Sequence, residues 1–483
     1  MKIFFIILSV LPTVVFGQPQ FNRDYEVVGQ PEGFCTTIYQ NGSYFTSGVV
    51  FYGSNGKYYL IELNTNGDTL RKKLHGKPTA SYYLGSNSLF SDDSNFIFIG
   101  KEVDTNGTFP FVSKMNFNFD TIWTSYKWNL PEGDFFDAKK TRDGYVFAGM
   151  HDSTTTNFDI LIVKCDTSGN LQWKKKIVTN EYEYAYSIDT TLDGGFVIAG
   201  WQRNAISWNS SWDIYITKLD SAGSIASGWP KVFGTTDSEA GWVRTLKDGS
   251  FAVWGGWESG SGNEKAHLRK LFPNGNTAWI QNFQNPGASA VIDVFTDLVE
   301  VENGDLVLTG MFYDSTINNP VGWILRTDSL GNEKWRRKLQ KRNEDNYLYS
   351  IQQTPDLGFV MSGFVFPDGG STTQDGWIIK VDSMGCLTPG CWVGMEEFSK
   401  DIHEFQIIPN PNNGNFEICA IEKNNKSKAL ITVSDVYGRA VWHKEMDFLQ
   451  SCTHVQMPGL SPGLYFICMD DGSLKITQPI IID

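Results

Sequence analysis

A short phrase that returns along the chain constrains the fold more than any other feature of the sequence. Residues 193–200 read DGGFVIAG, a turn followed by four apolar residues and a glycine. The closing glycine recurs at intervals of 49 to 55 residues, at Gly48, Gly100, Gly149, Gly200, Gly255, Gly310 and Gly363. Seven copies at a near-constant period are typical of a repeat architecture.

A second phrase keeps the same period. It reads KCDTSGNLQW at 164–173, KLFPNGNTAW at 270–279 and RTDSLGNEKW at 326–335. Its glycine recurs at Gly67, Gly169, Gly223, Gly275, Gly331 and Gly385, and Phe119 stands in its place in the second copy. Two phrases in register indicate seven copies of one structural unit.

Each copy resolves into four short strands separated by Gly, Asn and Asp turns. In the fourth copy we expect strands at 186–190, 196–201, 213–219 and 230–233. A four-stranded unit cannot bury both of its faces alone, so neighbouring units stack around an axis. The sequence therefore predicts an all-β fold, a seven-bladed β-propeller, in preference to an open β-solenoid, whose coils are usually shorter.

The last copy lacks a strong fourth strand. It offers strands at 348–353, 359–366 and 376–381, and then only Trp392-Val393. Residues 25–28, before the first copy, resemble the outer strand of other copies. We therefore expect the N-terminal segment to complete the last blade and close the ring.

Residues 1–17, MKIFFIILSVLPTVVFG, have one lysine, an apolar run and small residues before a cleavage point at Gln18. This pattern predicts a signal peptide for Sec export, since the apolar run is too short for a membrane anchor. No other stretch is apolar enough to predict a membrane-spanning segment. The net charge of −14 disfavours nucleic acid as a partner, because no basic excess exists to bind phosphates.

Seven cysteines leave at least one without an intramolecular partner. Cys386 and Cys391 flank a Leu-Thr-Pro-Gly turn and are candidates for a disulfide, with two unpaired thiols as the alternative. The pairing of the others stays open: Cys35, Cys165, Cys419, Cys452 and Cys468.

From about Tyr25 to Val393 the two phrases resemble the repeats of secreted bacterial propellers. The resemblance implies a propeller domain over residues 18–394 and names no ligand, since propellers host many unrelated functions.

Beyond Gly394 the repeat phrases stop. Residues 395–404 form a polar linker, followed by IIPNPNNGNF at 407–416, ITVSDVYGRAV at 431–441 and LSPGLYFI at 460–467. These phrases resemble the C-terminal sorting domain, type A, of type IX secretion cargo. The matched positions include Pro409, Asn410, Pro411, Gly414, Gly438 and Gly463.

This second resemblance implies a small C-terminal β-sandwich over residues 405–483 and the type IX secretion machinery as a partner. It places the protein on the cell surface or outside the cell. One departure is visible: the family usually ends in a basic, β-branched strand, whereas here Lys475 is the last basic residue and Pro479 interrupts the strand. The docking of the final strand is therefore open.

No catalytic pattern stands out. In RTDSLGNEKW the spacing of Asp328, Gly331 and Trp335 misses both the sialidase Asp-box and quinoprotein docking motifs. The histidines show no metal-ligand spacing, and no GxSxG or P-loop is present. We therefore expect no cofactor and no metal, although scattered carboxylates that meet in space would leave no trace in the sequence.

Half of the sixteen tryptophans fall in the fourth and fifth copies. Trp208 and Trp212 lie in the loop QRNAISWNSSW between the second and third strands, and Trp257 follows the second strand of the next copy. Exposed aromatic rings suit sugar or protein recognition. The alternative is that these rings fold back onto their blades.

The sequence thus favours a non-catalytic binding or adhesion propeller for a glycan or surface protein. The alternative is a polysaccharide-active hydrolase or lyase on the same scaffold. Three or more carboxylates, histidines or tyrosines that converge in the central funnel would favour the enzyme, and a plain polar or apolar funnel would favour the binding protein.

Overall fold

The computed structural model divides into two compact units between Leu387 and Thr388. It describes residues 18–26, 32–53, 55–85, 87–92, 94–130, 132–154, 157–179, 181–203, 212–234, 241–256, 266–283, 293–369, 373–388, 391, 405–420, 428–435, 439–447, 452–457, 459–470 and 475–482. The predicted signal peptide, the linker 395–404 and Trp392-Val393 lie outside these residues.

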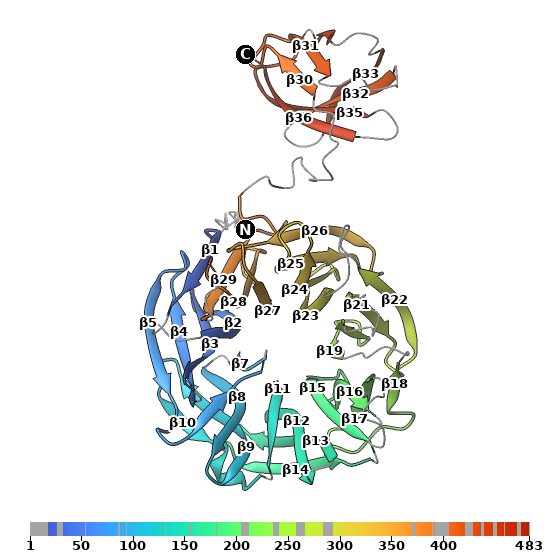
Figure 1. Ribbon diagram of the computed structural model, residues 1–483. Helices are drawn as coiled ribbons and strands as arrows, with labels where there is room; N and C mark the ends of the chain where they lie inside the picture. Colours follow the sequence, from blue (N-terminus) through green and yellow to red (C-terminus); the bar gives the residue numbers. More distant parts are fainter. Residues whose placement is uncertain are drawn as a thin grey trace, which may run out of the picture. The chain divides into compact units, whose positions relative to one another are not determined.

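In its described part the first unit contains seven antiparallel sheets, and Figure 1 shows them arranged in a ring. The first three sheets are β2 (Glu32–Gln40), β3 (Ser43–Tyr52), β4 (Asn55–Leu63) and β5 (Thr69–His75); β6 (Ser81–Tyr83), β7 (Leu89–Ser91), β8 (Asn95–Asp104), β9 (Gly107–Asn116) and β10 (Thr121–Thr124); and β11 (Gly133–Thr141), β12 (Gly144–Thr154), β13 (Asn157–Asp166) and β14 (Leu171–Ile177). A 3₁₀ turn, η1 (Ser125–Trp128), follows β10.

The next three sheets are β15 (Tyr182–Thr190), β16 (Phe196–Arg203), β17 (Asp213–Leu219) and β18 (Lys231–Phe233); β19 (Gly241–Thr245), β20 (Phe251–Gly255), β21 (Ala266–Leu271) and β22 (Thr277–Phe283); and β23 (Asp293–Glu300), β24 (Leu306–Asp314), β25 (Asn319–Thr327) and β26 (Glu333–Leu339). The seventh sheet is β27 (Asn346–Gln353), β28 (Phe359–Val365), β29 (Asp375–Val381) and β1 (Phe21–Tyr25). The strands β2, β7, β11, β15, β19, β23 and β27 lie nearest the centre of the ring (Figure 1).

The N-terminal strand closes the ring, but four residues earlier than the sequence predicts. β1 pairs with β29, with Phe21 opposite Lys380 and Tyr25 opposite Gly376. The prediction placed the strand at 25–28 by its resemblance to the outer strands of other copies, whereas the contact of the Phe21 ring with Gly67 lies four residues earlier. Residues 27 and 28 lie outside the described part of the chain.

The second phrase of the repeat is explained by a contact between neighbouring sheets. In five junctions the glycine of one turn packs against the tryptophan on or just before the outer strand of the preceding sheet. A Cβ added at Gly331, where φ is +82°, would meet the Trp279 ring at 2.7 Å, so only glycine fits. The same contact joins Gly169 to Trp123, Gly223 to Trp173, Gly275 to Trp229 and Gly385 to Trp335. We call this contact the tryptophan–glycine lock.

Two junctions use variants of this lock. At the ring closure Phe21 takes the place of tryptophan and lies against Gly67. At the next junction the roles are exchanged, because Arg71 stands where other sheets have tryptophan and Phe119 where they have glycine. The Arg71 guanidinium lies 4.4 Å from the centre of the Phe119 ring. All seven junctions therefore carry a ring contact at the same position.

The first phrase is explained by an ion pair that recurs in six of the seven sheets. In six sheets a lysine or arginine on the third strand binds the aspartate of the turn before the second strand. The pairs are Lys114–Asp92, Lys164–Asp143, Lys218–Asp193, Lys270–Asp248, Arg326–Asp305 and Lys380–Asp356, at 2.5 to 3.1 Å. The recurring aspartate and lysine thus belong to the scaffold rather than to a site.

The second unit contains two sheets within the described residues. They are β30 (Phe405–Ile408), β31 (Asn415–Ala420) and β34 (Cys452–Gln456); and β33 (Ala440–Asp447), β32 (Lys428–Asp435), β35 (Gly463–Asp470) and β36 (Lys475–Ile482). Phe416, Ile418 and Val455 from one sheet share a hydrophobic core with Ile431 and Ile467 from the other.

The final strand docks on this unit despite its proline. β36 pairs with β35 along its whole length, with Pro479 opposite Phe466. Because β36 is the edge strand, the missing N–H of proline breaks no ladder between two strands. Asn410 of the Pro-Asn-Pro motif accepts a hydrogen bond from the Ile481 N–H at 2.8 Å, which ties the motif to β36.

No helix among the described residues is long and apolar enough to cross a membrane. Cys386, Cys391 and Cys452 each take part in a disulfide, and Cys35, Cys165 and Cys468 form no disulfide. That Cys386 and Cys391 pair with each other stays a prediction.

Candidate functional site

The centre of the ring holds a cavity of about 360 Å³ lined by residues from all seven sheets. Its charged residues are Asp137 and Lys139 on β11, Lys140, Arg244 on β19 and Asp297 on β23. The described lining contains no histidine or tyrosine and only two carboxylates. The described lining of the cavity is therefore polar.

Both carboxylates of the central cavity are engaged by the scaffold. Asp137 accepts hydrogen bonds from the N–H groups of Ala138 and Ile188 and binds Lys139 at 2.7 Å. Asp297 accepts from Leu298 and Ile351 N–H and binds Arg244 at 3.2 Å. Ile188 and Ile351 belong to the neighbouring sheets, so each aspartate fastens one sheet to the next.

Serine side chains at the equivalent position of other inner strands also accept hydrogen bonds from the next sheet. Ser187 Oγ accepts a hydrogen bond from Val243 N–H at 2.7 Å, and Ser350 Oγ accepts from Thr37 N–H at 3.2 Å. These bonds also run from one inner strand to the next. The polar lining of the cavity is thus part of the mechanism that holds the ring together.

Aromatic side chains gather on the third to fifth sheets, at the end of the inner strand β15 where Tyr182 lies. They pack against one another, and we call them the rim cluster: Phe136, Phe158, Tyr182, Tyr184, Tyr186, Trp201, Trp212 and Trp242. The Trp201 ring is stacked between Tyr184 at 4.4 Å and Trp212 at 4.5 Å.

The rest of the rim cluster extends from this stack. Tyr186 stacks on Trp242 at 5.6 Å, and its hydroxyl accepts a hydrogen bond from Trp201 Nε1 at 3.0 Å. The Arg203 guanidinium lies 5.7 Å from the centre of the Trp212 ring. Trp201 is buried, whereas Tyr184, Tyr186, Trp212 and Trp242 are half-buried.

Of the three tryptophans proposed from the sequence, only Trp212 is described, and it folds back onto Trp201. Trp208 and Trp257 lie outside the described residues. Sequence reasoning did not single out Trp242, Tyr184 or Tyr186, which stand on first strands rather than in long loops. The run YEYAY at 182–186 was the available signal, because three aromatic residues at alternate positions point to one side of a strand.

Two buried carboxyl groups lie beside the rim cluster. Burial raises the pKa of Glu183 to about 7, and Glu183 Oε2 has no hydrogen-bond partner within the described residues. Burial also raises the pKa of Asp134 to about 6, although Lys101 lies 3.2 Å away and opposes the shift.

We expect Glu183→Gln to stabilise the protein at high pH. The pKa of Glu183 is about 7 in the folded chain and 4.5 when the carboxyl is solvated, so the folded state holds the extra proton between these values. As the pH rises from 4.5 through 7, ionisation of the buried group costs stability, and this cost is fully present above pH 7. Glutamine removes the cost.

The variant should therefore gain about 3 kcal/mol over wild type at pH 8 and little at pH 4.5. Thermal denaturation of both proteins across this pH range measures the difference. Glu333→Gln, an exposed glutamate on β26, serves as the control and should show no such pH dependence. An equal gain at both pH values would contradict the assignment.

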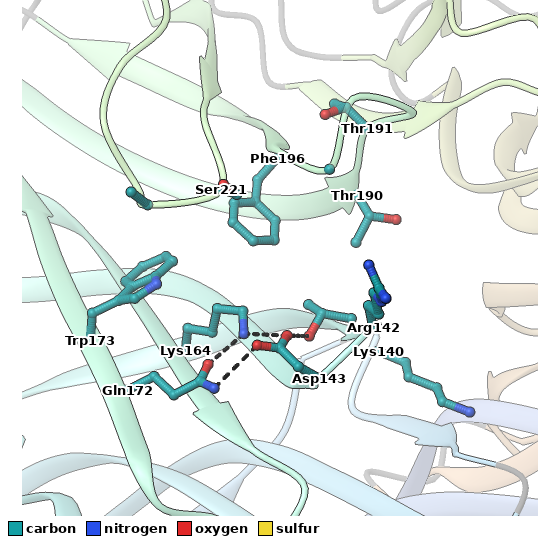
Figure 2. A pocket seen from close by; sticks show the side chains of 13 residues that line it. Lys140, Arg142, Asp143, Lys164, Gln172, Trp173, Thr190, Thr191, Phe196 and Ser221 are labelled. Atoms are coloured by element: carbon teal, nitrogen blue, oxygen red, sulfur yellow. Dashed lines mark hydrogen bonds and ion pairs between the residues drawn. The ribbon is translucent and has the colours of Figure 1, made fainter.

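A larger hollow of about 990 Å³ lies between the third and fourth sheets, on the side of the turns that precede the second strands (Figure 2). Lys164 on β13 binds Asp143 at 2.6 Å, and the Gln172 amide donates to Asp143 at 3.2 Å. The bond from Lys164 lowers the pKa of Asp143 to about 2. The other large side chains that line the hollow are Lys140, Arg142, Trp173 and Phe196.

Within the described residues no group of three or more histidine, cysteine or acidic side chains is placed to hold a metal ion.

Comparison with curated proteins gives no match. Solved structures of similar shape include a fungal alcohol oxidase of the AA5 family in complex with copper, with a TM-score of 0.45, 11% identity and coverage of 96% of this chain and 99% of that chain. A protein of unknown function from Dyadobacter fermentans has a TM-score of 0.43 and 12% identity over 76% of this chain and 99% of that chain. An endo-arabinase from Bacteroides thetaiotaomicron has a TM-score of 0.31 and 12% identity over 52% and 95%.

The C-terminal unit has a clear family match. Residues 406–483 match the family described as the secretion system C-terminal sorting domain. This agrees with the sequence phrases at 407–416, 431–441 and 460–467. A tail of this family implies secretion through the type IX system to the cell surface or the extracellular space.

Proposed function

We propose that the chain is an exported, non-catalytic binding protein: a seven-bladed β-propeller of residues 18–394 that recognises a glycan. Residues 1–17 direct it through the Sec pathway, and the linker 395–404 leads to a C-terminal β-sandwich of residues 405–483. The type IX machinery reads this last domain and delivers the propeller outside the cell.

One observation carries the binding role, the aromatic stack of the rim cluster, in which Tyr184 and Trp212 are half-buried on either side of the buried Trp201. The Tyr184, Trp201 and Trp212 rings are parallel within 25° and are held by packing and by the Trp201–Tyr186 hydrogen bond. Rigid rings lose little entropy on binding and offer an apolar face to the C–H side of a sugar. The central cavity supports the same reading, because its carboxylates are bound by backbone N–H groups and cations.

We expect Trp212→Ala to weaken glycan binding about tenfold, since one stacked ring contributes about 1.4 kcal/mol. Binding of the secreted chain to a glycan array identifies the ligand, and isothermal titration then compares the variant with wild type. Tyr52→Ala is the matched control, because Tyr52 is an exposed aromatic residue at the end of a second strand in another sheet. If Trp212→Ala and Tyr52→Ala bind as wild type does, the rim cluster is not the site.

A specific observation favours the alternative, a secreted polysaccharide-active hydrolase or lyase. Glu183 and Asp134 are carboxyls with raised pKa values, and a general acid needs a carboxyl that keeps its proton near neutral pH. Both side chains are buried, however, so a substrate would reach them only after a rearrangement. Release of reducing ends or unsaturated products from a polysaccharide, lost in Glu183→Gln, would establish the enzyme.

A further inference from the structure

The hollow in Figure 2 contains residues that the repeat does not explain. Lys164, Asp143 and Trp173 recur as the ion pair and the tryptophan–glycine lock of other sheets. Lys140 and Arg142 belong to neither. They stand on β11 and in the turn after it, and both are exposed.

These two residues make the hollow cationic in an acidic protein. Its thirteen lining residues include three cations, Lys140, Arg142 and Lys164, and a single carboxylate, Asp143. Asp143 is already bound to Lys164, and its lowered pKa keeps it charged. Arg142 has no ion pair or hydrogen bond within the described residues, so its guanidinium is available to an anion, whereas the whole chain carries −14.

The rest of the lining suits a sugar ring rather than a bare ion. In Figure 2 Trp173 lies away from Arg142 and Lys140, with Phe196 between them. The Trp173 and Phe196 rings meet edge to face at 6.0 Å. Side chains that can donate and accept hydrogen bonds complete the wall: Thr141, Gln172, Thr190, Thr191 and Ser221. The rings suit the flat face of a sugar, and the hydroxyl and amide side chains suit its hydroxyl groups. The cations, which lie at one end of the hollow, suit an acidic group on the same sugar.

We propose that this hollow binds an acidic saccharide, with Arg142 and Lys140 holding the carboxylate of a uronate residue. Arginine is suited to this role because its planar guanidinium forms two parallel hydrogen bonds to a carboxylate. The site lies at the opposite ends of β15 and β16 from the rim cluster, since Thr190 and Phe196 line the hollow and Tyr182 and Arg203 flank the rim. It is therefore a second binding site that does not rest on the rim cluster.

Isothermal titration of the full secreted chain with trigalacturonate tests the proposal, with a neutral galactose trimer and inorganic sulfate as comparison ligands. We expect trigalacturonate to bind and the neutral trimer to bind at least tenfold more weakly. Arg142→Ala should weaken trigalacturonate binding about tenfold, and Lys140→Ala should weaken it several-fold. Raised salt should weaken it further.

Two controls separate this site from general charge and from the rim cluster. Lys176→Ala removes an exposed cation from β14 of the same sheet without touching the hollow, and it should bind as wild type does. Trp212→Ala should also keep full trigalacturonate affinity. Unchanged binding in Arg142→Ala, equal binding of the neutral trimer, or equally tight binding of sulfate would each overturn the proposal.

Discussion

Deletion of residues 18–26 is expected to open the ring and to lower the melting temperature by about 6 °C or more. The deletion removes β1, the outer strand of the seventh sheet, and with it five paired positions along β29. It also removes the Phe21 ring from Gly67 and the Asp24 carboxylate from Lys341 and Arg342. The seventh sheet would keep three strands, and it would lose the contact between Phe21 and Gly67 that joins it to the first sheet.

The size of this effect follows from the hydrogen bonds and the buried ring that the deletion removes. Each backbone hydrogen bond contributes about 1 kcal/mol, and burial of a phenylalanine contributes about 2 kcal/mol. The sum is about 5 kcal/mol or more. Thermal denaturation of the mature chain with and without residues 18–26 measures it.

A point substitution on the same strand provides the control. Arg23→Ala removes a solvent-exposed pair with Asp68 and should cost less than about 1 kcal/mol. An unchanged melting temperature after the deletion would contradict the closure. The predicted cleavage point precedes Gln18, whose N–H donates to Asp356 at 2.8 Å, so signal-peptide removal there leaves the closing segment intact.

The architecture of the repeat was readable from the sequence because its determinants are local. Glycine turns, short alternating strands and a period near 50 residues are set by neighbours along the chain. The sequence predicts that an N-terminal strand completes the seventh sheet, but it places that strand four residues too late. Its defining residue, Phe21, replaces tryptophan in the lock, and only the paired strands show that Phe21 stands opposite Lys380 as Trp335 stands opposite Arg326.

The candidate sites were less predictable because they are built across sheets. The rim cluster joins Phe136 on β11 to Tyr186 on β15 and Trp242 on β19, which lie about fifty residues apart in the chain. The pattern of tryptophans in long loops therefore pointed to Trp212 and not to its partners. The cationic hollow has the same origin, since Arg142 and Thr190 meet only where two sheets adjoin.

The two aspartates of the central cavity could be mistaken for a catalytic pair. Asp137 and Asp297 converge on the axis, as catalytic carboxylates would, yet each serves as a hydrogen-bond acceptor for the next inner strand. Convergence alone is therefore a weak sign of catalysis in a ring of sheets. Whether the carboxylate oxygens already accept hydrogen bonds from the backbone distinguishes a structural aspartate from a catalytic one.

The exchanged lock between the first and second sheets yields the second prediction, that Phe119→Gly costs about 3 kcal/mol. Phe119 is buried, and its ring covers the Arg71 guanidinium at 4.4 Å. Arg71 also binds Glu62, which stands where most other sheets have lysine, so three positions at this junction differ from those at the other junctions. Arg71→Trp alone should cost about 2 kcal/mol, because the indole and the Phe119 ring compete for one space.

The double variant Arg71→Trp, Phe119→Gly restores the tryptophan–glycine pair of the other junctions. If the two positions were independent, the double variant would lose about 5 kcal/mol. We expect a loss of only about 2 kcal/mol, because the new tryptophan packs on the new glycine while Glu62 loses its cation. Urea denaturation of the four proteins gives the coupling energy. Additive losses would show that the ring at this junction is not part of a shared lock, whereas a strong coupling would show that one contact, in two chemical forms, joins the neighbouring sheets.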